Sequence, residues 1–99
     1  MKNTYKTGYV FLMYDIADEE SEIGKNRVAK VYKICKKYLT PHQKSVFRGE
    51  ISPANLRKLT NELKNVIDEN LDFISIIKLK NKKSFLEESL GKGDSELFI

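Results

Sequence analysis

Six consecutive large apolar residues, 9–14, constrain the fold of this chain more than any other feature. Gly8 precedes the run, Asp15 ends it, and three of its side chains are aromatic, which is typical of a β-strand. No polar residue alternates with the apolar ones, so both faces of this strand are expected to be covered in the folded protein. The fold must therefore supply a covering layer on each side of the sheet that contains residues 9–14.

Two amphipathic helices are predicted further along the chain. The first covers residues 24–39 and ends at Thr40-Pro41, because proline cannot continue a helix. The second begins at Ser52-Pro53, with serine as its N-cap and proline in the first helical position. The apolar faces of the two helices are formed, respectively, by Val28, Val31, Cys35, Tyr38 and Leu39 and by Leu56, Leu59, Leu63, Val66 and Ile67.

Two more strands are predicted, at residues 43–51 and 72–79. The segment 43–51 is either one strand with its exit, or it contains the second arm of a hairpin, with Arg48-Gly49 as a kink. The second interpretation gives the order βαββαβ of a ferredoxin-like α+β fold. In that fold both helices cover one face of an antiparallel sheet, and we expect a second copy of the chain to cover the other face in a homodimer.

The length of 99 residues predicts a single domain, 1–99. Residues 84–99 are predicted to form a C-terminal tail whose last residues add an edge strand to the partner subunit. Cys35 is the one cysteine, so no disulfide forms within the chain, and the apolar run 9–14 is too short to span a membrane. We therefore predict a cytoplasmic protein without a membrane partner.

The first predicted helix is strongly basic. It carries several of the 18 Lys and Arg residues that give the chain its net charge of +4. Such a surface is either an ordinary solvated face or a site for nucleic-acid phosphates, which require positive charge but no base-specific geometry. The residues predicted to contact nucleic acid are Lys25, Arg27, Lys30, Lys33 and Lys37.

Asp15 is the main candidate for chemistry because it ends the first strand, where a side chain is both positioned and accessible. Aspartate is also a common turn residue, and spacing alone favours that role. A lone carboxylate is a poor metal site, but a two-fold axis near Asp15 would bring two carboxylates together around one Mg²⁺ or Mn²⁺ ion. The metal hypothesis therefore depends on the dimer hypothesis.

Three stretches together resemble one protein family. They are Tyr14-Asp15-Ile16 at the end of the first strand, residues 26–31 (Asn-Arg-Val-Ala-Lys-Val) on the first helix, and residues 43–50 (Gln-Lys-Ser-Val-Phe-Arg-Gly-Glu) after it. In this order they are similar to the second, small CRISPR-associated adaptation protein, a virus-defence nuclease that partners the CRISPR integrase. The resemblance covers nearly the whole chain, from Gly8 to Leu79.

The resemblance implies a ferredoxin-like homodimer in which Asp15 of each subunit binds a divalent metal ion, Mg²⁺ or Mn²⁺. It implies an endonuclease that hydrolyses phosphodiester bonds in RNA or double-stranded DNA, with Asp15, Tyr14, Arg27 and Phe47 as the catalytic group. It also implies that the dimer bridges two integrase dimers and holds the DNA fragment that becomes a new spacer.

Two departures from the family pattern bear on catalysis. Lys25 stands where some members carry an arginine, which keeps the charge but loses the bidentate fork, and Thr40-Pro41-His42 stands where some carry a basic residue. Two other functions therefore stay open. One is a non-catalytic scaffold that grips duplex DNA and docks the integrase, and the other is a toxin-like enzyme of the same fold that cleaves messenger RNA.

Overall fold

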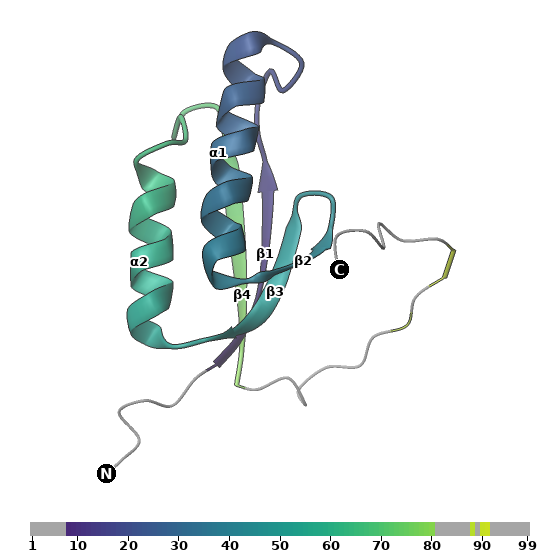
Figure 1. Ribbon diagram of the computed structural model, residues 1–99, viewed down its shortest axis with the longest axis vertical. Coiled ribbons are helices and arrows are strands. Elements are labelled where there is room, and N and C mark those ends of the chain that lie inside the picture. The colour runs from purple at the N-terminus through teal and green to yellow at the C-terminus, as the bar shows by residue number, and fades with distance from the viewer. Residues whose placement is uncertain (1–7, 81–87, 89, 92–99) are drawn as a thin grey trace.

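The computed structural model describes residues 8–80, 88, 90 and 91. The predicted edge strand at the end of the chain lies outside these residues, so that strand stays a prediction. In chain order (Figure 1), the elements are β1 (Gly8–Asp15), α1 (Glu22–Tyr38), β2 (Thr40–Gln43), β3 (Val46–Ile51), α2 (Pro53–Lys64) and β4 (Phe73–Leu79).

The strands of the described residues form one antiparallel sheet in the order β2-β3-β1-β4. Both helices lie side by side against the same face of this sheet (Figure 1). The order of elements and the order of strands are those of the predicted ferredoxin-like βαββαβ fold, which confirms the α+β class. β1 lies between β3 and β4, so both of its edges are hydrogen-bonded to neighbouring strands.

The hairpin of β2 and β3 confirms one interpretation of residues 43–51 and corrects its details. The sequence predicts a kink at Arg48-Gly49, but the chain turns earlier, at Ser45, which takes a left-handed backbone conformation with a φ of 61°. Pro41, predicted only to end a helix, lies within β2. Because β2 is an edge strand, it tolerates a proline that has no amide hydrogen to donate to the ladder.

Each helix begins at a serine that caps it. The Ser21 hydroxyl accepts a hydrogen bond from the amide of Gly24, and the Ser52 hydroxyl accepts one from the amide of Asn55, both at 3.1 Å. The second cap confirms the predicted start at Ser52-Pro53, whereas the first starts α1 two residues before the predicted position. Neither of these helices is long and apolar enough to cross a membrane.

The hydrophobic core lies between the sheet and the two helices. Its fully buried side chains include Leu12 of β1, Phe47 of β3 and Leu59 of α2. Cys35 of α1 is also fully buried, as its place on the apolar helix face predicts. Burial raises the pKa of the Cys35 thiol to about 12, so this group is a packed thiol rather than a nucleophile.

The opposite face of the sheet, here called the open face, carries the remaining side chains of β1. Because successive side chains of a strand alternate between its two faces, the open face receives Tyr9, Phe11, Met13 and Asp15, of which Tyr9 is buried. On β4 it includes Phe73 and Ile77, whose side chains are 66% and 47% exposed. Both described helices cover the other face (Figure 1), so the second covering layer predicted from the sequence is not supplied by residues 8–80.

Candidate metal and nucleic-acid site

Asp15 is the last residue of β1, and its side chain is exposed. It lies opposite Phe73, the first residue of β4, in the antiparallel register of these two strands. β1 runs toward the end of the molecule where α1 begins (Figure 1). The β1–β4 ladder therefore holds the backbone up to Asp15, and the loop that leads into α1 begins directly after it.

That loop is packed directly against the first turn of α1. The carbonyl oxygen of Asp18 accepts hydrogen bonds from the amide and the hydroxyl of Ser21, at 2.9 and 2.8 Å. Asp18 itself takes a left-handed backbone conformation, with a φ of 53°. A Cβ atom on Gly24 would lie 1.8 Å from the same carbonyl oxygen, so the close approach of loop and helix requires glycine at this position.

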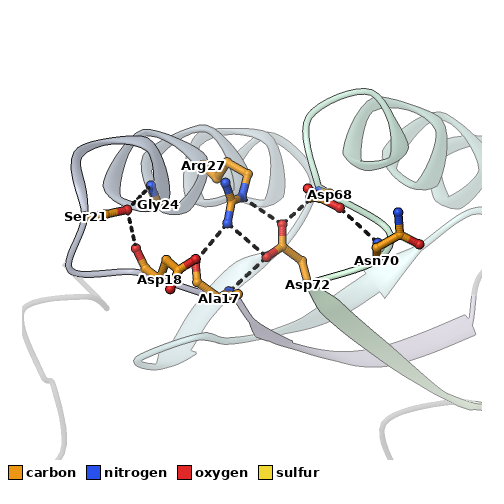
Figure 2. Close-up of polar contacts among 8 residues, drawn as sticks. All are labelled: Ala17, Asp18, Ser21, Gly24, Arg27, Asp68, Asn70 and Asp72. Atoms are coloured by element: carbon orange, nitrogen blue, oxygen red, sulfur yellow. Dashed lines mark hydrogen bonds and ion pairs between the residues drawn. The ribbon is translucent and has the colours of Figure 1, made fainter.

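A buried ion pair holds the loop two residues after Asp15. Figure 2 shows the Arg27 guanidinium of α1 facing the Asp72 carboxylate, which lies just before β4. Arg27 Nε donates to Asp72 Oδ2 at 2.9 Å, and Arg27 Nη2 donates to Asp72 Oδ1 at 3.3 Å. The same pair engages both sides of residue 17: the Ala17 amide donates to Asp72 Oδ1 at 2.9 Å, and Arg27 Nη2 donates to the Ala17 carbonyl at 2.8 Å.

The Asp72 carboxylate is fully enclosed, with a side-chain exposure of 0%, against 14% for Arg27. It also accepts a hydrogen bond from the amide of Asp68 at 2.8 Å, which ties in the α2–β4 loop. Burial by itself raises the pKa of Asp72, but the amides of Asp68 and Ala17 and the Arg27 guanidinium outweigh it and lower the pKa below its usual range. Asp72 is therefore a charged group that is completely satisfied by its neighbours.

Tyr14 and Phe47, implied by the resemblance to belong to the catalytic group, lie on the core side of the sheet. Their rings stack, with centroids 6.3 Å apart, and Tyr32 packs edge-on against Phe47 at 5.3 Å. Burial raises the pKa of Tyr14 to about 12. Phe47 is fully buried, so any effect it has on Asp15 passes through the packing of Tyr14 and the β1 backbone. A catalytic role for either residue stays a prediction.

The basic residues of α1 occupy two kinds of environment. Lys25, Lys30 and Lys33 are exposed to solvent. Lys37 forms an ion pair with Glu62 of α2, which joins the two helices. Arg27, which the sequence places in the same group, is instead committed to Asp72 and the Ala17 carbonyl. Contact of any of these residues with nucleic acid stays a prediction, and the exposed lysines are the ones placed for it.

One subunit offers few ligands for a metal ion. No group of three or more His, Cys, Asp or Glu side chains within residues 8–80 is arranged to hold a metal. Asp15 provides one exposed carboxylate, a hard oxygen ligand of the type that Mg²⁺ takes while keeping several of its waters. The donor set of one chain thus fits a hydrated divalent ion, held more firmly if a second chain contributes its own Asp15.

The sequence does not mark Asp72 as a site residue. The pattern places it at the beginning of the third predicted strand, and its partner Arg27 lies 45 residues away in the chain. The available signal is the position of an acidic residue directly before a strand that pairs with β1. That signal does not identify the arginine or the peptide that the carboxylate would bind.

The comparisons with known proteins agree with this geometry. A model of the family described as CRISPR associated protein Cas2 matches residues 8–85. The CRISPR-associated endoribonuclease Cas2 of Fusobacterium nucleatum is 37% identical to this chain over 93 residues, which cover 90% of this chain and 86% of that protein. The protein of the same name from Thermotoga maritima is 39% identical over 83 residues, which cover 84% of this chain and 87% of that protein.

Solved structures extend the similarity to three dimensions. A crystal structure of Cas2 matches with a TM-score of 0.74 and 35% identity, and covers 90% of this chain and 92% of that chain. The crystal structure of Streptococcus pyogenes Cas2 at pH 6.5 matches with a TM-score of 0.73 and 33% identity, and covers 84% of this chain and 99% of that chain. The family predicted from the residues is thereby confirmed: this chain belongs to the CRISPR-associated protein Cas2 family.

Proposed function

We propose that this chain is a metal-dependent endonuclease that cleaves RNA as a homodimer. The observation that carries the proposal is the exposed Asp15 carboxylate at the end of β1, followed by a loop that the Arg27–Asp72 pair holds. Relatives that match most of the chain are named endoribonucleases, which supports nuclease activity and favours RNA over double-stranded DNA as the substrate.

The dimer is part of this proposal because one chain supplies a single carboxylate. The open face carries Asp15 beside the exposed apolar side chains of Phe73 and Ile77. Covering this face with a second copy would bury those side chains and bring the two carboxylates toward a shared axis. Each subunit would then contribute its Asp15 to one Mg²⁺ or Mn²⁺ ion.

The residues of this chain have distinct tasks in the proposed reaction. Asp15 binds and orients the divalent ion, which when bound lowers the pKa of a coordinated water and polarises the phosphate. Exposed lysines of α1, with Lys25 in its first turn, attract the nucleic-acid backbone and offset the negative charge that grows on the phosphate during cleavage. Tyr14 and Phe47 support the strand that carries Asp15 from the core side.

A second candidate function is a scaffold in CRISPR adaptation, in which the dimer bridges integrase dimers and holds the incoming DNA fragment. One observation favours it: of the implied catalytic group, Phe47 is fully buried and Arg27 is engaged by Asp72, so Asp15 is the exposed member. The exposed lysines serve a scaffold equally well, because phosphate contacts position a duplex without any chemistry.

The deciding experiment compares wild type with Asp15→Asn in cleavage of single-stranded RNA and duplex DNA, with Mg²⁺, with Mn²⁺ and with chelator. Asp18→Asn is the matched control, because it makes the same chemical change on an exposed side chain of the loop that follows Asp15. We expect metal-dependent RNA cleavage that Asp15→Asn abolishes and Asp18→Asn retains. Absence of cleavage under all conditions, with salt-sensitive duplex binding intact, would leave the scaffold as the function.

A further inference from the structure

We propose that Arg27 and Asp72 are positioning residues that act together on the Ala17 peptide and thereby aim the Asp15 carboxylate. This inference rests on the proposed metal-binding role of Asp15. It assigns Asp72 to the site, and it gives Arg27 a task other than contact with the substrate. The class of ligand concerned is a divalent cation with its water shell.

The backbone is held at Asp15 and at the two residues that follow it. On the strand side, Asp15 pairs with Phe73 in the β1–β4 ladder. The next residue, Ile16, is buried in the core. The residue after that, Ala17, has its amide bound by Asp72 and its carbonyl bound by Arg27 (Figure 2). Three successive residues are thus fixed by three different means, and Asp15 is the one whose side chain reaches solvent.

The same contacts limit a direct role for Arg27 at a phosphate to its Nη1 group, because Nε and Nη2 are engaged within the protein. Its Nε and Nη2 donors already serve Asp72 and the Ala17 carbonyl, and its side chain is 14% exposed. Turning the guanidinium toward a substrate would leave the Asp72 carboxylate, which is completely buried, without its counter-ion. The buried Asp72 carboxylate therefore keeps Arg27 in its place beside it.

The pair also does more than join two parts of the fold. A buried ion pair is often no more stabilising than apolar side chains of the same size, so stability alone does not explain it. Apolar side chains could not form directional hydrogen bonds to a peptide. The pair supplies an acceptor for the Ala17 N–H and a donor for the Ala17 carbonyl. Groups that hydrogen-bond directly to a metal ligand typically change metal affinity or activity about 10- to 100-fold when they are altered, and this pair acts one step further away, on the Ala17 peptide.

The test uses the full chain labelled with ¹⁵N, and the variants Asp72→Asn and Arg27→Lys. Asn keeps the size of the side chain but removes an acceptor, while Lys keeps the charge but loses the planar fork by which Arg27 reaches Asp72 and the Ala17 carbonyl together. Ser52→Ala is the matched control, because it removes the cap of α2 and so destabilises the fold without touching residues 15–18. All proteins are compared at a temperature where thermal melts show them fully folded.

Three readouts are measured: hydrogen exchange of the Ala17 amide, Mn²⁺ affinity from line broadening of the Asp15 amide, and the Mg²⁺ dependence of RNA cleavage. In wild type the Ala17 amide should exchange as slowly as the amides of the β1 ladder. In both variants we expect faster exchange at Ala17, Mn²⁺ affinity weaker by up to about 10- to 100-fold, and RNA cleavage that requires correspondingly more Mg²⁺ while the KM for RNA is unchanged. Ser52→Ala should keep wild-type values in both metal readouts, because general loss of stability does not alter the metal dependence of the folded fraction. Any faster exchange at Ala17 in Ser52→Ala should be matched by the amides of the β1 ladder, whereas Asp72→Asn and Arg27→Lys should speed exchange at Ala17 beyond those amides.

Mn²⁺ binding by wild type and by the variants distinguishes a wrong positioning role from a wrong proposed function. If Asp15→Asn abolishes Mn²⁺ binding but Asp72→Asn and Arg27→Lys bind Mn²⁺ as wild type does, the positioning role is wrong and the metal site stands. If wild type itself binds no Mn²⁺ at Asp15, the proposed function fails, and the assignment of a metal-positioning role fails with it. Fast exchange of the Ala17 amide in wild type would overturn the inference without any variant.

Discussion

Replacing Gly24 with alanine is expected to destabilise the protein, although alanine is the better helix former. In a helix interior, this exchange alone would add up to about 1 kcal/mol of stability. Here the new Cβ would lie 1.8 Å from the Asp18 carbonyl oxygen and 3.0 Å from that of Ala17. These are backbone atoms rather than the flexible ends of side chains, so the loop or the start of α1 must move.

The size of the loss follows from what that movement disturbs. Forcing extra atoms into a packed site costs about 1–3 kcal/mol, and occasionally more. The Asp18 carbonyl is held by two hydrogen bonds from Ser21, which a displaced loop would also weaken. From a middle value of about 2 kcal/mol for the extra atoms, the propensity gain subtracts about 1 kcal/mol and the weakened hydrogen bonds add about 1 kcal/mol. We therefore expect a net loss of about 2 kcal/mol in the free energy of unfolding. For a domain of this size, that loss lowers the Tm by about 8–16 °C.

Urea unfolding followed by circular dichroism measures the effect, at a fixed protein concentration because the apparent stability of a dimer depends on concentration. Ala29→Gly is the companion variant, since residue 29 is an exposed position of the same helix. It should cost about 1 kcal/mol through helix propensity alone. A Gly24→Ala protein as stable as wild type, or more stable, would refute the close approach of loop and helix.

Three further predictions concern buried groups. Phe47→Ala should lower the free energy of unfolding by about 3–5 kcal/mol, because the side chain is fully buried against Tyr14 and Tyr32; a loss below about 1 kcal/mol in urea unfolding would contradict this packing. The folded-state pKa of Asp72 is lowered, so the stability that its carboxylate contributes is complete above the ordinary aspartate pKa of about 3.9 and is lost as the pH falls through the lowered value. The Tm difference between wild type and Asp72→Asn should therefore shrink below about pH 4, and a difference independent of pH would count against the buried carboxylate. Burial raises the pKa of Cys35 to about 12, so a thiol reagent at about pH 8 should label the native protein slowly and the urea-unfolded protein quickly; rapid native labelling would contradict the buried thiol.

Much of the fold was predictable because its signals are local. The unbroken apolar run 9–14 became β1, with one more residue at each end, and the Ser52-Pro53 pair started α2 as expected. Capping, chain-breaking and apolar periodicity each act within a few residues, so the sequence alone reveals them. The β2–β3 hairpin was located less well, because Pro41 resembles a helix stop, and its tolerance depends on β2 being an edge strand.

The candidate site also has one residue that local sequence predicts and a pair that only the fold brings together. Asp15 was identified from its place at the end of a strand, and the structure leaves it exposed there. The sequence places Arg27 among the basic residues of a helix, and the resemblance adds it to the catalytic group, but nothing near it in the chain marks it as the partner of a buried carboxylate. Its task emerges only with Asp72, which lies 45 residues further on.

By itself, the sequence determined the presence of β1, the two helices and β4, the start of α2 and the carboxylate that ends β1, because each of these depends on neighbouring residues. The tertiary structure alone decided which charges are available. It buries Asp72 with Arg27, encloses Phe47 and leaves Asp15 in solvent. The physical reason is that the free energy of a charge depends on the groups and solvent around it, and folding brings those groups from distant parts of the chain.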